Sequence, residues 1–288
     1  MALRIATIIQ MQHPISIFCA FIAILLWASL AMTSSLLKGI PPFFQLAIAF
    51  SVGALPVLLK GRKAFPSQRT LILGVAGLFG YHFFLFTAFR LAPPVEANLI
   101  NYLWPMLMVM LAPLFFRESS LKMGHFIGAA LALVGVAILV TQQEVSLTAE
   151  NLLGYGCALG AAFTWPIYSL LKRKTPDEAV ITTAGICLIA SLLCAVTHYV
   201  LEERVAPTSE QWYLLLWLGL GPFGAAFYLW DFSLKKGDPR IIGALSYLTP
   251  VLSTVLLVFG AGLDATSATW TAMLFMSVGS LVGAGLSR

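Results

Sequence analysis

The sequence predicts an all-α, polytopic membrane protein with ten transmembrane helices in two inverted repeats of five. Of its 288 residues, 59% are hydrophobic and only 10% are charged, whereas soluble domains carry about 25% charged residues. Ten segments have the length of about 20 mostly apolar residues that a helix needs to cross a bilayer. Motifs from the first half of the chain also recur in the second half.

The ten predicted spans follow one another along almost the whole chain. The first has an apolar stretch longer than the roughly 7–15 residues of a signal-peptide core, so we keep it as a helix. The second and the seventh are the least regular, because they contain Pro56 and His198. The predicted spans cover residues 15–37, 41–59, 70–91, 94–116, 122–140, 152–171, 179–201, 210–234, 240–260 and 267–287.

The loops differ strongly in basic residues when they are assigned alternately to the two sides of the membrane. Because basic loops tend to stay in the cytoplasm, we expect both termini on the cytoplasmic side of the membrane. The basic side holds Arg4, Lys60, Arg62, Lys63, Arg69, Arg117, Lys122, Lys172, Arg173, Lys174, Lys235, Lys236, Arg240 and Arg288, and the other side only Lys38, Arg90 and Arg204. The basic loops account for the net charge of +5. We do not expect the protein to bind nucleic acid, because the chain has no basic soluble module for that purpose.

Two motifs recur between the halves of the chain. PPVEANLINYLWPMLMVML begins at Pro93, and DPRIIGALSYLTPVLSTVL begins at Asp238, 145 residues later. Upstream, GLFGYHFFLF (77–86) aligns with GPFGAAFYLW (221–230). We therefore predict one membrane domain with two five-helix halves, 1–146 and 147–288. Because five is odd, the halves enter the membrane in opposite senses, an arrangement typical of secondary transporters.

The fourth span carries polar residues on one helical face. Asn98, Asn101, Tyr102 and Pro105 lie at i, i+3, i+4 and i+7, with Trp104 at the border of this face. Proline removes a helix hydrogen bond and crowds the preceding turn, so we expect a kink near mid-membrane. Proline-interrupted helices at matching positions of two halves indicate a midplane binding site. Prolines that only shape the helices for packing are the alternative.

The second half supplies the matching residues. Tyr247 and Pro250 occupy the positions of Tyr102 and Pro105 in the ninth span. In the sixth span, Trp165 precedes Pro166, which we expect to be a third kink that takes part in gating. Deep aromatic rings offer stacking surfaces, so we include Tyr247 and Trp165 among the candidate substrate-binding residues.

Tyr81 and His82 lie near the middle of the third span. An ionisable residue inside the membrane is a functional candidate by default. A buried neutral histidine that makes one interhelical hydrogen bond is the alternative. Both residues join the candidate substrate-binding set.

The spans lack the groups that other functions require. Glu96 and Asp231 are placed near span ends, and no Ser/His/Asp set, zinc motif or phosphate loop is present. The four cysteines lie in apolar segments without metal-ligand or disulfide spacing. We therefore expect no catalytic residues, no metal site and no cofactor, and a protein that is not an enzyme.

Two spans carry small residues four positions apart. Gly124 and Gly128 lie in the fifth span, and Gly279 and Gly283 in the tenth. This spacing lets helix backbones approach closely. Such seams suit either an internal scaffold or a homodimer, so the chain is expected to be a monomer or a homodimer.

The ten-helix pattern, the tryptophans at 27 and 165 and the two proline-centred spans resemble the drug/metabolite transporter superfamily, in its EamA-type branch. Within that branch, YHFFLFTAFRLAPPVEANLINYLWPML (81–107) is similar to bacterial aromatic amino acid exporters. The resemblance implies a location in the cytoplasmic (inner) membrane of a bacterium and a central cavity with alternating access to the two sides of the membrane. It also implies that Tyr81, His82, Tyr102, Trp104 and Trp165 line this cavity.

The first functional hypothesis is therefore an efflux transporter or facilitator for amino acids, with Phe, Tyr and Trp favoured. Its partners are the small-molecule substrate and the lipid bilayer. A second hypothesis keeps the fold but changes the solute to drugs or other metabolites. Nucleotide sugars fit less well, since their phosphates call for Lys or Arg in the cavity. A membrane-embedded enzyme or an assembly factor is the third hypothesis.

Overall fold

The computed structural model describes residues 14–116, 121–140, 149–175, 179–261 and 266–285, and these residues contain helices and no strand. The predicted all-helical class is therefore confirmed over this part of the chain. The α-helices are α2 (Pro14–Leu36), α3 (Pro42–Gly53), α4 (Pro56–Lys60), α5 (Gln68–Leu91), α6 (Pro94–Asn101), α7 (Trp104–Phe115), α8 (Met123–Val140), α9 (Leu152–Arg173), α10 (Thr183–Leu201), α11 (Ser209–Leu220), α12 (Ala226–Lys236), α13 (Pro239–Leu245), α14 (Leu248–Ala261) and α15 (Ser267–Gly285). Shorter helical turns are η1 (Gly61–Ala64), η2 (Ala149–Asn151), η3 (Val180–Thr182) and the π-helical η4 (Gly221–Ala225).

Several helical segments have the length and composition of membrane spans. Five are long and apolar enough to cross a bilayer: Pro42–Ala64, Gln68–Leu91, Val180–Leu201, Ser209–Lys236 and Pro239–Leu256. Shorter apolar helices cover Pro14–Leu30, Trp104–Phe115, Met123–Ile138 and Ser267–Gly283. Many large apolar side chains remain exposed, with Leu59 at 86% and Phe259 at 76%. Lipid is the environment in which such a surface is stable.

Four of the predicted spans are not single α-helices. The interruptions of the fourth and ninth spans accompany the proline kinks predicted there, whereas those of the second and eighth spans were not predicted. The helices of the four spans break or change winding at Ala54–Leu55, at Tyr102–Leu103, at η4 and at Ser246–Tyr247. Each break lies within a few residues of a proline, which has no backbone N–H to continue the helical ladder. The prolines are Pro56, Pro105, Pro222 and Pro250. By contrast, α9 runs without a break through Pro166.

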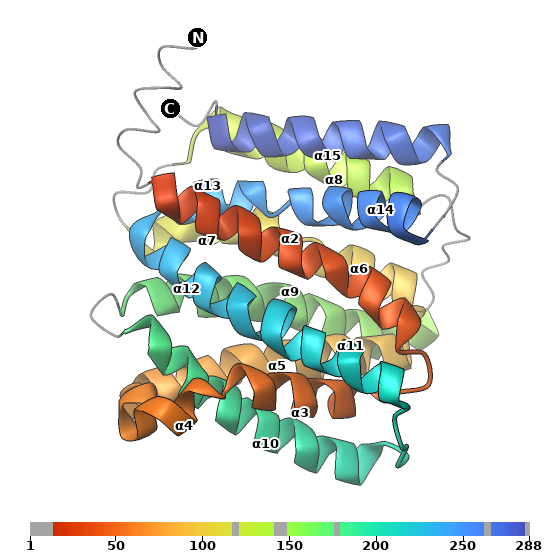
Figure 1. Cartoon of the computed structure of the whole chain (residues 1–288). Helices are drawn as coiled ribbons and strands as arrows, with labels where there is room; N and C mark the ends of the chain where they lie inside the picture. The colour runs from red at the N-terminus through yellow and green to blue at the C-terminus, as the bar shows by residue number, and fades with distance from the viewer. Residues whose placement is uncertain (1–13, 117–120, 141–148, 176–178, 262–265, 286–288) are drawn as a thin grey trace.

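The helices form a layered bundle (Figure 1). The pair α8 and α15 lies at one edge, and the pair α3 and α10 lies at the opposite edge. Between them, α5, α7 and α6 pack on α9, while α12 and α14 pack on α2. These inner helices surround the candidate site.

Glycines allow the closest helix contacts. A Cβ atom on Gly128 would lie 2.4 Å from the backbone nitrogen of Gly283 and 2.6 Å from the carbonyl oxygen of Gly279. The two small-residue seams therefore face each other inside one chain, between α8 and α15. In the same way, a Cβ on Gly77 would lie 2.3 Å from the ring of Tyr168, so glycine sets the short distance between α5 and α9.

Candidate functional site

A cavity of about 680 Å³ lies among the inner helices. Its outermost lining residues, Pro42, Phe89 and Pro94, lie at helix ends, where α3 and α6 begin and α5 finishes. We call this the mouth end of the molecule, and the opposite end, where α9 and α12 finish, the closed end. The lining residues are Trp27, Leu30, Pro42, Gln45, Leu46, Tyr81, His82, Leu85, Phe86, Phe89, Pro94, Asn98, Asn101, Tyr102, Val136, Trp165, Leu218, Phe223, Phe227, Thr249, Pro250, Ser253 and Thr254.

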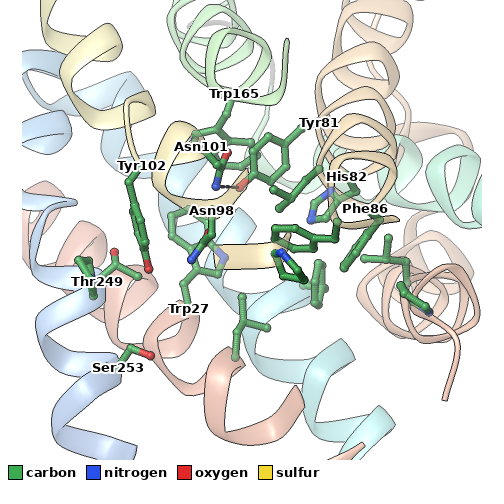
Figure 2. Close-up of a pocket in the computed structure, with 18 of the residues that line it drawn as sticks. Trp27, Tyr81, His82, Phe86, Asn98, Asn101, Tyr102, Trp165, Thr249 and Ser253 are labelled. Carbon is green, nitrogen blue, oxygen red and sulfur yellow. Dashed lines mark hydrogen bonds between the residues drawn. The ribbon is translucent and has the colours of Figure 1, made fainter. Parts of the chain in front are cut away.

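One side of the cavity is aromatic (Figure 2). The rings of Tyr81 and Trp165 lie 5.4 Å apart between centroids, and those of Trp27 and Trp165 lie 5.5 Å apart in an edge-to-face arrangement. The ring of Phe223, from η4, lies 5.3 Å from that of His82. Rings from four helical segments thus form one continuous wall that can stack on a planar ligand.

His82 is oriented by its own helix. Its Nδ1 lies 2.7 Å from the carbonyl oxygen of Leu78, one turn earlier in α5. Because a carbonyl only accepts hydrogen bonds, Nδ1 carries the proton in this contact. The side chain is 6% exposed and is flanked by the rings of Phe50 and Phe223. The alternative predicted from the sequence, a histidine bonded to another helix, does not describe this contact, since the bond stays within α5.

The other side of the cavity is polar and comes from α6 and α14. The Asn101 amide Nδ2 donates to the hydroxyl of Tyr81 over 3.3 Å, which ties α6 to α5. Figure 2 shows the amide of Asn98 pointing into the cavity and the hydroxyl of Tyr102 beside Thr249. No Asp, Glu, Lys or Arg is among the described residues that line the cavity. The site can therefore offer hydrogen bonds and ring contacts, but no full counter-charge.

The two helix breaks place the polar residues. The helix α6 ends at Asn101 and α7 begins at Trp104, so Tyr102 lies in the break with its N–H bonded to the Asn98 carbonyl. In the second half, Tyr247 lies in the matching break between α13 and α14. There the carbonyl of Ser246 accepts from the N–H of Thr249 over 3.0 Å. Each break is thus stabilised by short turns that replace the hydrogen bonds lost at proline.

The sequence-predicted residues separate into two groups. Tyr81, His82, Asn98, Asn101, Tyr102, Trp165 and Pro250 line the cavity. Trp104, Tyr247, Pro105 and Pro166 lie outside its lining, and all four are buried. Trp104 packs behind the wall, with its ring centroid 6.5 Å from that of Trp165.

Sequence reasoning missed several lining residues. Gln45 could have been found as the amide in an apolar span, and Ser253 and Thr254 follow Pro250 by three and four residues on one helical face. Phe223 and Phe227 carried no such signal, because the π-helical turn at η4 changes the facing of this helix.

Buried charges at the closed end are a second departure from the prediction. Lys172 and Asp231 are 3% and 2% exposed, although Lys172 was counted with the loops. Their Nζ and Oδ2 atoms lie 3.8 Å apart, and Lys235 Nζ lies 3.1 Å from the same oxygen. The hydroxyl of Thr183 donates to this oxygen over 3.4 Å. At the mouth end, Glu96 is also buried, and it accepts a hydrogen bond from Tyr155.

Among the described residues, no group of three His, Cys, Asp or Glu side chains could hold a metal ion. The four cysteines are all free.

Comparison with known proteins identifies the family. The model of the EamA-like transporter family matches residues 14–141 and again residues 152–283. The chain belongs to this family. EamA-like proteins are membrane transporters, which agrees with the apolar helices described above.

Individual relatives are similar over nearly the whole chain. The aromatic amino acid exporter YddG of Ancylobacter novellus is 38% identical over 269 residues, which cover 89% of this chain and 92% of the relative. The protein of the same name from Salmonella typhimurium is 26% identical, with coverages of 91% and 94%. A crystal structure of a protein 36% identical in sequence superposes with a TM-score of 0.90 and covers 95% of this chain and 97% of the other.

Proposed function

We propose that this EamA-family protein exports amino acids, with aromatic ones favoured, by alternating access through the central cavity. The observation that carries the proposal is the cavity itself, whose aromatic wall faces a polar wall without charged side chains. Relatives that bear the name of aromatic amino acid exporters support it.

The size and shape of the cavity suit such a solute. A volume of about 680 Å³ lies within the range of about 300–1,000 Å³ that is usual for small-molecule sites. An indole or phenyl ring would stack between Trp165, Tyr81 and Phe86. The amide of Asn98 and the hydroxyls of Tyr102 and Ser253 would hydrogen-bond the amino and carboxylate groups.

The expected binding is weak, as export requires. Each aromatic contact contributes about 0.5–1.5 kcal/mol beyond burial of area, and a total of about 4 kcal/mol corresponds to a dissociation constant of about 1 mM. A lining without charged side chains adds no strong ion pair that would trap the substrate. It also disfavours nucleotide sugars, whose phosphates need Lys or Arg partners. Export of other metabolites or of drugs is the alternative.

We further propose ten membrane spans in two inverted halves, 1–146 and 147–288. The family model matches each half separately. The packing is also paired: α5 and α7 contact α9 in the way that α12 and α14 contact α2. Pro94 and Pro239 begin α6 and α13, and Tyr102 and Tyr247 lie in the breaks that follow.

The proposed orientation places the closed end in the cytoplasm of a bacterial cell, together with both termini. Among the described residues, the loops and helix ends at the closed end hold most Lys and Arg, while the mouth end has Lys38, Arg90 and Arg204. The positive-inside rule then assigns the closed end to the cytoplasm. The cavity in this conformation faces away from the cytoplasm, and movement of the halves about the breaks at Pro105 and Pro250 would expose it to the other side.

Flux in proteoliposomes tests the proposal. Labelled tryptophan, phenylalanine, threonine and a cationic dye would be followed with and without a pH gradient. We expect fast flux of tryptophan and phenylalanine at equal pH. Flux of all four solutes equal to that in empty liposomes would rule out transport of this class. Threonine flux without tryptophan flux would rule out the aromatic preference.

A further inference from the structure

Four tryptophans from different helices pack against one another beside the cavity, and we call them the tryptophan plug: Trp27, Trp104, Trp165 and Trp230. They come from α2, α7, α9 and α12. Trp27 and Trp165 belong to the aromatic wall of the cavity, while Trp230 contacts both of their rings from outside the lining and is 2% exposed. A solute that leaves the cavity toward the closed end must therefore pass this plug.

Polar bonds join α12 to α9 at the plug and one residue beyond it. The indole nitrogen of Trp230 donates to the hydroxyl of Ser169 over 3.1 Å. The next residue of α12, Asp231, pairs with Lys172, one turn after Ser169 in α9. Because Trp230 and Asp231 are neighbours, a movement of α12 that withdraws the tryptophan must also break the ion pair.

Asp231 has a second partner that moves with it. Lys235 lies one turn later in the same helix, and its Nζ is 3.1 Å from Asp231 Oδ2, closer than the 3.8 Å to Lys172. If α12 left α9, Asp231 would keep Lys235, and Lys172 would face the water that enters the opened pathway. Removing a buried charge from its partner is normally strongly unfavourable. Here the arrangement gives both charges a stable environment in each state, as a reversible gate requires.

We propose that Asp231 and Lys172 form a latch between α12 and α9 that holds the pathway shut at the closed end. The pair stabilises the closed plug while it is intact, and its release frees Trp230 to move away. The inference rests on the proposed alternating access, in which one end opens when the other closes. In this proposal the latch sets the equilibrium between the state that is open at the mouth end and the state that is open at the closed end.

Cysteine labelling at the two ends measures this balance. The native Cys187 is fully buried. It lies one turn after Thr183, the first residue of α10, whose hydroxyl donates to Asp231 at the closed end. It would serve as one reporter after Cys19, Cys157 and Cys194 are replaced by alanine. A Gln45→Cys substitution in a chain without other cysteines would report on the mouth. Each protein would be treated with a small water-soluble maleimide.

The main variant is the single substitution Lys172→Met, which removes one member of the latch and leaves Asp231 paired with Lys235. The double substitution Asp231→Asn with Lys172→Met removes both charges of the latch but also takes the carboxylate from Lys235, so it serves as a second version. We expect at least about a tenfold rise in the labelling rate of Cys187 and a fall in the rate of Gln45→Cys. The matched control is Asp238→Asn, which breaks the Asp238–Arg240 pair at the same end, outside the plug.

Opposite changes at the two reporters distinguish a latch from a merely structural ion pair. Faster labelling at both ends would mean that the variants loosen the fold, and this would overturn the proposal. Unchanged labelling at Cys187, or an equal response to Asp238→Asn, would overturn it as well. The assay needs no substrate, so failure of the tryptophan flux with intact reciprocal labelling would reject the proposed function and leave the latch standing.

Discussion

Phe86 offers a test of ring stacking that can be separated from folding. Its side chain lines the cavity and contacts His82, Phe43 and Phe89 at centroid distances of 6.0–6.3 Å. Phe86→Leu keeps a large apolar side chain and removes the π face. The loss of one aromatic contact with the substrate amounts to about 0.5–1.5 kcal/mol. The half-saturating concentration for tryptophan should therefore rise roughly two- to tenfold.

The assay is concentration-dependent flux of tryptophan into proteoliposomes, with leucine as the non-aromatic solute. Phe84→Leu is the matched control, because Phe84 lies two residues away in α5, is 39% exposed and is absent from the cavity lining. We expect the control to behave as the parent protein. The reasoning is refuted if Phe86→Leu leaves the tryptophan value unchanged, or raises the values for tryptophan and leucine by the same factor.

Three further predictions concern stability in detergent. Gly128→Leu should lower the midpoint of thermal unfolding, because any Cβ atom at this position meets the α15 backbone. Gly156→Ala, which has open space around it, should raise the free energy of unfolding by up to about 1 kcal/mol. Equal effects of the two substitutions would contradict the close contact between α8 and α15. Glu202→Gln should lower the free energy of unfolding by about 1 kcal/mol, measured by thermal unfolding. The reason is that the Glu202 carboxylate accepts hydrogen bonds from the first free N–H groups of α3. An unchanged stability would show that α3 does not need this cap. Burial alone would raise the pKa of Asp238, but the bonds of its carboxylate to Arg240 outweigh burial and lower the pKa. The ionised carboxylate should therefore stabilise the fold at neutral pH, and this stabilisation should be lost as the pH falls below about 4. Asp238→Asn should flatten the dependence of the unfolding midpoint on pH in that range, and an unaltered dependence would refute the assignment.

The sequence was sufficient to predict where the helical segments lie and seven of the residues that line the cavity. Apolar length alone located each helical segment, and the repeated Tyr-x-x-Pro motif pointed to the breaks beside the site. The polar residues before the first break, Asn98 and Asn101, line the cavity, and their contact with a substrate stays a prediction.

Residues beyond a break could not be placed by helical spacing. The face defined by Asn98 was extrapolated at 100° per residue to Pro105, but the turn at Tyr102–Leu103 ends that progression. As a result, Pro105 and Trp104 face the protein interior and not the cavity. A single sequence also could not reveal the latch, because a buried Lys172 is stable only with a partner from another helix, and that pairing depends on how α9 and α12 pack.

Protection of a cysteine inside the cavity tests the central claim most directly. Ser253→Cys, in a chain without its four native cysteines, would be labelled with a maleimide in the presence of tryptophan or lysine. If aromatic amino acids bind in this cavity, tryptophan slows the labelling in proportion to its occupancy and lysine does not. Labelling that proceeds at the same rate at tryptophan concentrations that saturate transport would contradict the account.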